Sequence, residues 1–69
     1  MKFAWEKGFT IAARIDGEKV IISANREGLV SLAHHLLALA DEIPRGHFHL
    51  DEHNSLKDGS CELVFERVE

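Results

Sequence analysis

The chain has 69 residues, a formal net charge of −4, 45% hydrophobic residues and a single cysteine, Cys61. These values predict one domain, residues 1–69, without an internal disulfide and in a reducing, cytoplasmic setting, since no signal peptide is recognisable. With no basic run and no long apolar segment, nucleic-acid binding and a membrane span are both disfavoured.

Two β-strands are the first predicted elements. The segments FTIAARI and KVIISA are rich in β-branched residues, and Asp16-Gly17 between them is typical of a tight hairpin. We therefore expect residues 9–15 and 18–24 to form an antiparallel pair. The preceding segment, KFAWE, also alternates and is expected to be an extra strand or the start of the first one, with a bulge at Gly8.

An amphipathic helix is predicted next, near residues 26–42. Asn25 is a suitable N-cap, Glu27 lies where the helix dipole favours an anion, and Pro44 ends the helix. Apolar residues with helical spacing are expected to face the core: Leu29, Leu32, Ala33, Leu36, Leu37, Ala40 and Ile43. The opposite face is expected to be polar and solvated, with Ser31, His34, His35, Asp41 and Glu42.

The C-terminal part predicts two further strands, HFHLD and CELVFERV, separated by a polar loop. The order ββαββ predicts an α+β fold, a two-layer sandwich with one helix packed on one face of a small, mostly antiparallel sheet of at least four strands. The expected core consists of Leu32, Leu36, Phe48, Leu50, Leu63 and Phe65.

The stretch GHFHLDEH, residues 46–53, brings histidines and carboxylates together. Side chains alternate across a strand, so if Phe48 and Leu50 pack under the helix, their polar neighbours point to the other face. The residues expected on that open face are His47, His49, Asp51, Glu62 and Glu66. We expect them to exchange hydrogen bonds across the strands and to contact a partner, although the trio from 47–51 could instead stabilise the hairpin or its loop.

A metal site on this face is an alternative to the protein-binding interpretation. Imidazoles two residues apart on a strand are about 7 Å apart, close enough to chelate one ion. An open face offers no closed ligand shell, so we expect no tight metal and no cofactor. A weak ion site, if formed, would use His47, His49 and Asp51.

Three segments, EGLVSLAHHLLALA, PRGHFHLDEHNSL and GSCELVFERV, occur together over about residues 20–68. In combination they resemble a family of small bacterial immunity proteins of polymorphic toxin systems, the immunity protein 32 family. The most specific segment of the resemblance, GxHxHLD, matches Gly46, His47, His49, Leu50 and Asp51. The resemblance implies a non-enzymatic protein that binds and neutralises a cognate toxin, and it assigns no catalytic residue. It is weakest over residues 1–15.

Two alternatives stay open at this point. One is a metal- or small-ligand-binding domain that uses the face of His47, His49 and Asp51. The other is a homodimer that buries the open sheet face, on which Ala12, Ile21 and Val64 are expected to lie. A partly apolar open face needs cover, and a second copy could supply it.

Overall fold

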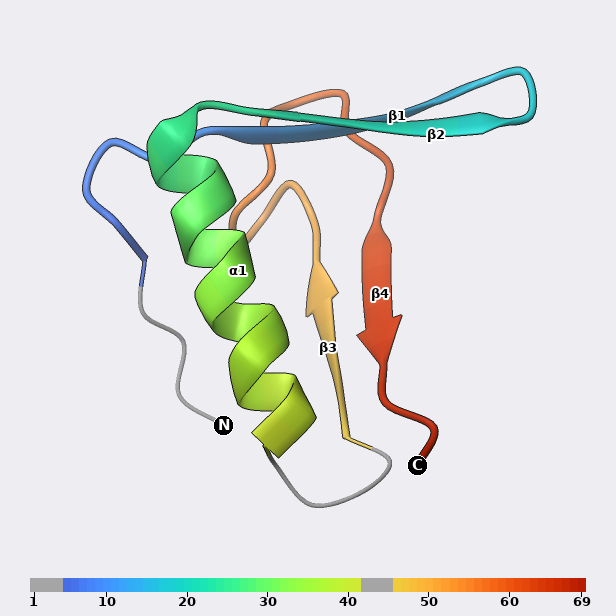
Figure 1. Ribbon diagram of the computed structural model, residues 1–69. Helices are drawn as coiled ribbons and strands as arrows, with labels where there is room; N and C mark the ends of the chain where they lie inside the picture. Colours follow the sequence, from blue (N-terminus) through green and yellow to red (C-terminus); the bar gives the residue numbers. More distant parts are fainter. Residues whose placement is uncertain (1–4, 42–45) are drawn as a thin grey trace.

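The computed structural model describes residues 5–41 and 46–69 of the chain (Figure 1). Its elements are strands β1 (Ile11–Asp16) and β2 (Lys19–Ala24), helix α1 (Arg26–Asp41), and strands β3 (His47–Leu50) and β4 (Leu63–Glu66). The predicted α+β class and the order ββαββ are confirmed. The predictions for Glu42, Ile43 and Pro44, and those for most of KFAWE, lie outside the described residues.

Both strand pairs are antiparallel hairpins. In the first, Asp16 pairs with Lys19, and the turn between them uses Gly17 at a φ of 63°. A left-handed backbone of this kind suits a tight hairpin turn and favours glycine. In the second, Phe48 pairs with Phe65. The hairpin predicted from Asp16-Gly17 is therefore confirmed.

The four strands do not form the single sheet that the pattern predicted, but two sheets of two strands each. The reason lies at the free edge of β1, where an irregular stretch of the loop before β4 takes the hydrogen bonds. Lys57 N donates to Ile11 O at 2.9 Å and Cys61 N donates to Ala13 O at 3.0 Å. The β1–β2 hairpin consequently crosses one end of the α1 and β3–β4 layers and extends beyond them (Figure 1).

This division also separates residues that were expected to share one open face. Ala12 and Ile21 lie in the β1–β2 sheet, whereas Val64 lies on β4 in the other sheet. The continuous open sheet face expected to support a homodimer is therefore not formed.

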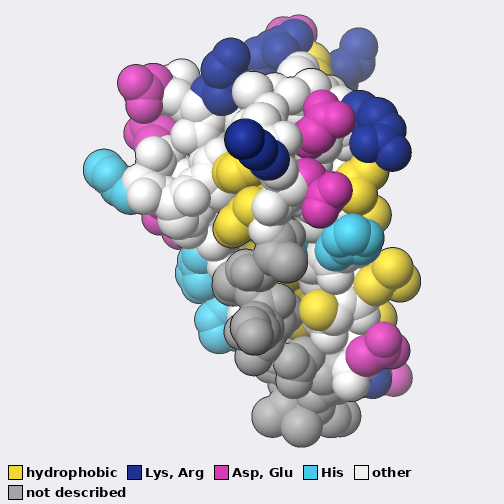
Figure 2. Space-filling view, turned by 90° about the vertical axis from the view of Figure 1, so that its left-hand side faces the viewer, with side chains coloured by type: hydrophobic (Ala, Val, Ile, Leu, Met, Phe, Trp, Pro, Cys, Tyr) yellow, Lys and Arg dark blue, Asp and Glu magenta, His cyan; other side chains and the backbone are white. Residues whose placement is uncertain are grey.

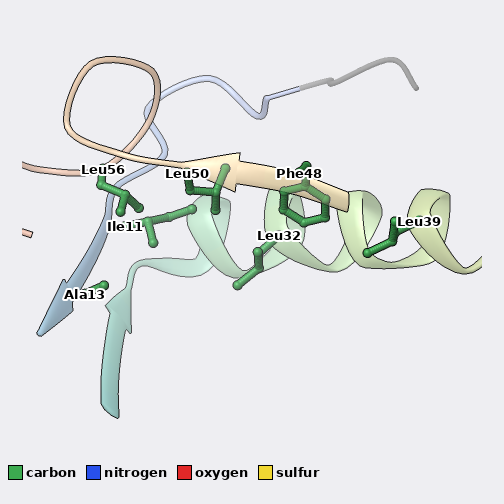
Figure 3. Close-up of a cluster of buried hydrophobic side chains, with 7 residues drawn as sticks. All are labelled: Ile11, Ala13, Leu32, Leu39, Phe48, Leu50 and Leu56. Carbon is green, nitrogen blue, oxygen red and sulfur yellow. The ribbon is translucent and has the colours of Figure 1, made fainter. Parts of the chain in front are cut away.

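The hydrophobic core lies between α1, the start of β1 and the inner face of β3 (Figure 3). Its buried members are Ile11, Ala13, Leu32, Leu39, Phe48, Leu50 and Leu56. Half-buried side chains pack around it, namely Trp5, Phe9, Ala24, Cys61, Leu63 and Phe65. The predicted core positions of Leu32, Phe48 and Leu50 are confirmed, and Phe65 stacks on Phe48 with ring centroids 5.0 Å apart.

The face of α1 that meets the core differs from the predicted one. Ser31 and His35, expected in solvent, are 0% and 1% exposed, whereas Leu36, expected in the core, is 39% exposed. The buried residues of the helix are Gly28, Ser31, Leu32, His35 and Leu39. The helix is thus rotated relative to the prediction, and Leu29 and Leu37 are exposed instead.

Contacts with distant segments explain this rotation. Gly28 lies so close to β1 that a Cβ there would overlap the Thr10 carbonyl oxygen. Ser31 Oγ accepts a hydrogen bond from Glu6 N at 2.8 Å, and the His35 ring meets the Trp5 ring edge to face at 4.2 Å. Ser31 Oγ also donates to Glu27 O at 2.8 Å, so the buried hydroxyl has both an acceptor and a donor partner.

The predicted N-cap is confirmed, and it also joins the helix to the first hairpin. Asn25 Oδ1 accepts from Gly28 N at 2.8 Å and from Thr10 N at 2.9 Å, while Asn25 Nδ2 donates to Gly8 O at 2.9 Å. None of the helical structure in residues 5–41 and 46–69 has the length and hydropathy needed to cross a membrane.

Candidate functional site

The register of the second hairpin defines the candidate site. His47 lies opposite Glu66 and His49 opposite Val64, whereas the alternating pairs from Phe48 and Leu50 face the core. We call the solvent side of this hairpin the outer face; it consists of His47, His49, Glu62, Val64 and Glu66, all of which are exposed. The predicted outward orientation of the histidines and of Glu62 and Glu66 is confirmed.

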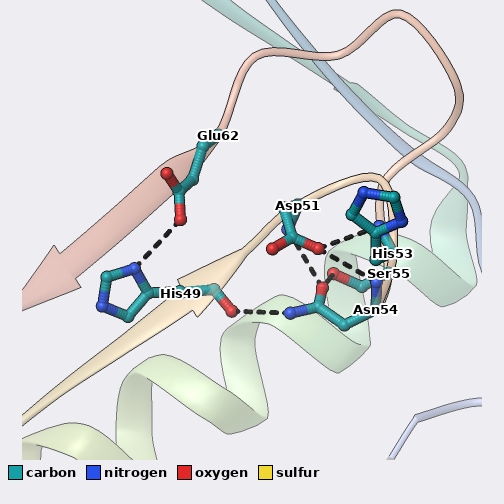
Figure 4. Close-up of polar contacts among 6 residues, drawn as sticks. All are labelled: His49, Asp51, His53, Asn54, Ser55 and Glu62. Atoms are coloured by element: carbon teal, nitrogen blue, oxygen red, sulfur yellow. Dashed lines mark hydrogen bonds and ion pairs between the residues drawn. The ribbon is translucent and has the colours of Figure 1, made fainter.

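The outer face carries the cross-strand contact that was expected of it. His49 Nδ1 lies 3.1 Å from Glu62 Oε2 (Figure 4), and the ring centroids of His47 and His49 are 5.1 Å apart. The side chains of His49 and Glu62 are 49% and 55% exposed. A contact this exposed typically contributes less than about 1 kcal/mol, so both groups remain available to a partner.

Asp51, by contrast, is engaged in the loop that follows β3. Its Oδ1 accepts from His53 N at 2.8 Å and from Asn54 N at 3.1 Å. The Asn54 side chain makes two further hydrogen bonds: its Oδ1 accepts from Asp51 N, and its Nδ2 donates to His49 O (Figure 4). Asp51 therefore stabilises the loop, and the outer face is formed without it.

Asn54 was not among the predicted site residues. An Asn three residues after an Asp is nevertheless a recognisable turn signal, because both side chains hydrogen-bond nearby backbone groups. The pair holds the end of β3 in place and thereby fixes the backbone that carries His49.

The same geometry bears on metal binding at the outer face. Among residues 5–41 and 46–69, no group of three or more His, Cys, Asp and Glu side chains is arranged to hold a metal ion. His47 and His49 are neighbours on the outer face, but the carboxylate of Asp51 is turned into its loop.

Negative charge is concentrated in the part of the chain that carries this site. Residues 46–69 contain six carboxylate side chains, and their only lysine and arginine are Lys57 and Arg67. In the view of Figure 2, Lys and Arg side chains gather towards the top, whereas histidine surface lies along the left-hand edge and also to the right of centre. The outer face is thus suited to a partner with a basic surface.

Comparison with protein families identifies the family of this chain. The family model described as Immunity protein 32 matches residues 19–68. The chain belongs to the Immunity protein 32 family. The match begins at the first residue of β2 and covers α1, β3, β4 and the whole outer face, so the predicted resemblance is confirmed. No curated protein and no solved structure matches the chain.

Proposed function

We propose that this member of the Immunity protein 32 family is a non-enzymatic protein that binds and neutralises a cognate bacterial toxin. The observation that carries the proposal is the family match over residues 19–68. It includes the exposed, acidic hairpin surface described above, and such a surface is suited to recognition of another protein.

The proposed contact is centred on the outer face. The inner side chains of the same strands, Phe48 and Leu50, are 3% and 1% exposed and hold the hairpin to the core. Folding therefore depends on one side of the hairpin, which leaves the other side available for a partner. Imidazoles and carboxylates on that side can pair with lysine, arginine and backbone groups of the toxin.

The outer face alone is smaller than a stable protein interface, so the proposed contact must extend beyond it. Two strands of four residues cover roughly 14 Å by 10 Å, whereas a stable protein interface buries about 800 Å² on each partner. Val64 and Val68, which are 53% and 69% exposed, offer apolar area beside the charged groups. We therefore expect the toxin to cover Val64, with the histidines and glutamates around it and the 52–54 turn at the rim.

The proposal predicts that a toxin gene lies beside the gene for this chain, and the test uses the protein that this gene encodes. Co-expression should restore growth, and calorimetry with the purified proteins should show a stable complex. The double variant Glu62→Ala with Glu66→Ala should weaken binding at least about tenfold. The control Glu18→Ala with Asp58→Ala removes the same charge from exposed positions outside the outer face and should leave the affinity unchanged.

The possible results distinguish an error in the proposed function from an error in the proposed contact surface. If the wild-type chain neither binds the toxin nor protects the cell, the immunity function is wrong. If it binds and the outer-face variant binds equally well, the function stands and the contact lies elsewhere. If the toxin is inactivated without a stable complex and carries a covalent change by mass spectrometry, the protein is an enzyme and the non-enzymatic proposal fails.

A further inference from the structure

Helix α1 exposes a second apolar surface that the core does not use. Leu29, Leu36 and Leu37 are 55%, 39% and 63% exposed, and Ala33 and Ala40 on the same side of the helix are exposed as well. These five residues, which we call the helix stripe, follow one side of the helix because they are spaced by three, four or seven positions. Hydrophobic side chains are visible on the right-hand side of Figure 2, the side to which the front of Figure 1 has turned.

The helix stripe has the spacing of a helix-pairing seam. From Leu29 to Ala33, Leu36 and Ala40 the steps are four, three and four residues, which is the heptad pattern through which one helix packs on another. The face of α1 that includes Leu32 and Leu39 already packs on the protein's own core. The stripe is therefore left open to a helix from outside the described residues.

The stripe is also symmetrical along the helix. Leu29 and Leu37 lie four residues to either side of Ala33, and Arg26 and Ala40 lie seven residues to either side. Two copies of α1 running antiparallel with Ala33 against Ala33 would place Leu29 of each copy against Leu37 of the other. A surface that is complementary to itself in this way suits a closed dimer with two-fold symmetry.

The charges at the ends of the helix select the same arrangement. α1 begins at Arg26, whose side chain lies 3.6 Å from the Glu27 carboxylate and is still 78% exposed, and ends at Asp41, with no basic residue in its last turn. A carboxylate at a helix C-terminus is disfavoured by the helix dipole, and a nearby cation offsets this. Antiparallel pairing brings Arg26 of one copy beside Asp41 of the other, whereas parallel pairing would bring like charges together.

We propose that this protein forms a homodimer through antiparallel pairing of the helix stripe, with the two-fold axis near Ala33. A pair of helices about 24 Å long forms a small interface, below about 1,200 Å² in total, so association depends on concentration.

The first experiment measures mass against concentration by sedimentation equilibrium, from about 1 μM to about 1 mM. The wild-type mass should rise from that of the monomer towards twice that value. Ala33→Glu places two carboxylates at the axis and should weaken association at least about 100-fold. Ser23→Glu introduces the same charge at an exposed position of β2, off the helix, and should dimerise like the wild type. Circular dichroism confirms that both variants fold.

A charge-exchange experiment tests the axis itself. Ala33→Glu and Ala33→Lys should each be monomeric alone, because Ala33 meets its own copy, and an equimolar mixture should recover the dimer as a heterodimer. A wild-type chain that stays monomeric at about 1 mM would overturn the proposal and leave the stripe to a different protein. A dimer that survives Ala33→Glu, or a mixture that stays monomeric, would show that the copies do not pair about Ala33.

Discussion

Replacing Gly28 by alanine should destabilise this protein, although the same change stabilises most helices. Alanine is favoured over glycine inside a helix by about 1 kcal/mol, because it restricts the unfolded backbone. At residue 28 the added methyl group has no room. It would overlap the Thr10 carbonyl oxygen and lie 3.0 Å from Ile11 Cγ1 and 3.1 Å from Ala24 Cβ.

The size of the effect follows from what has to move. Carbon and carbonyl oxygen make contact at roughly 3.3 Å, so α1 must withdraw from β1 by an amount of the order of 1 Å. Overpacking of this kind costs about 1–3 kcal/mol. The shift also strains the bond from Gly28 N to Asn25 Oδ1, a cap worth about 1 kcal/mol. After the gain in helix propensity, we expect a net loss of about 2 kcal/mol, which lowers Tm by roughly 8–16 °C.

Urea unfolding followed by circular dichroism measures this difference, at one low protein concentration so that association does not contribute. Ala33→Gly is the matched control, since Ala33 is an exposed residue of the same helix and should lose about 1 kcal/mol when alanine is removed. The protein should therefore be more stable with alanine than with glycine at residue 33, and less stable with alanine than with glycine at residue 28. A Gly28→Ala protein as stable as the wild type, or more so, would show that the helix does not approach β1 this closely.

Three further substitutions test the core, the cap and the loop. Leu50→Ala should lower the free energy of unfolding by about 2–5 kcal/mol, because Leu50 is buried. Leu36→Ala, at a site 39% exposed, should lower it by less than about 1.5 kcal/mol. Equal losses in urea unfolding would contradict the orientation of the helix. Asn25→Ala should cost about 2 kcal/mol by removing the helix cap and the acceptor for Thr10 N; Asn25→Asp keeps the acceptor and should recover most of the loss of Tm. Asp51→Ala should open its loop to limited proteolysis before the protein unfolds, and an unchanged cleavage rate would contradict the role of this carboxylate.

The elements that could be predicted from the sequence are those fixed by local signals. Asp16-Gly17 indicates its hairpin because a tight turn favours positive φ, and Gly17 has that φ. Asn25 indicates the start of the helix because its side chain satisfies a free N–H of the first turn. Alternation around Phe48 and Leu50 correctly assigns the two faces of β3, since a strand has only two.

The orientation of α1 could not be predicted in this way. Apolar residues cover about half of its circumference, so the hydrophobic pattern is compatible with more than one inward face. The choice is made by partners far along the chain: Glu6 N bonds to Ser31 Oγ across 25 residues, and Trp5 covers the His35 ring. The hydroxyl of Ser31 can be buried because this hydrogen bond satisfies it, and helical spacing contains no information about either contact.

The division into two sheets has the same kind of origin. The edge of β1 accepts hydrogen bonds from Lys57 N and Cys61 N, more than forty residues away in a stretch without strand periodicity. Sequence patterns identify strands by the alternation of their side chains, whereas these bonds involve only the backbone. Strand order therefore could not be read from the pattern, although the strands themselves could.

Helix α1 separates the two proposed surfaces, and this leads to a final prediction. The helix packs on the inner side of β3 and β4, so the outer face and the helix stripe point away from each other on either side of the core. A dimer formed through α1 then leaves both outer faces open, and each copy can hold its own toxin. We expect Ala33→Glu to bind the toxin with wild-type affinity, and Glu62→Ala with Glu66→Ala to dimerise like the wild type. Sedimentation of the complex should show two chains with two toxins. If Ala33→Glu lost toxin binding while remaining folded, the stripe itself, or the dimer, would be part of the toxin contact.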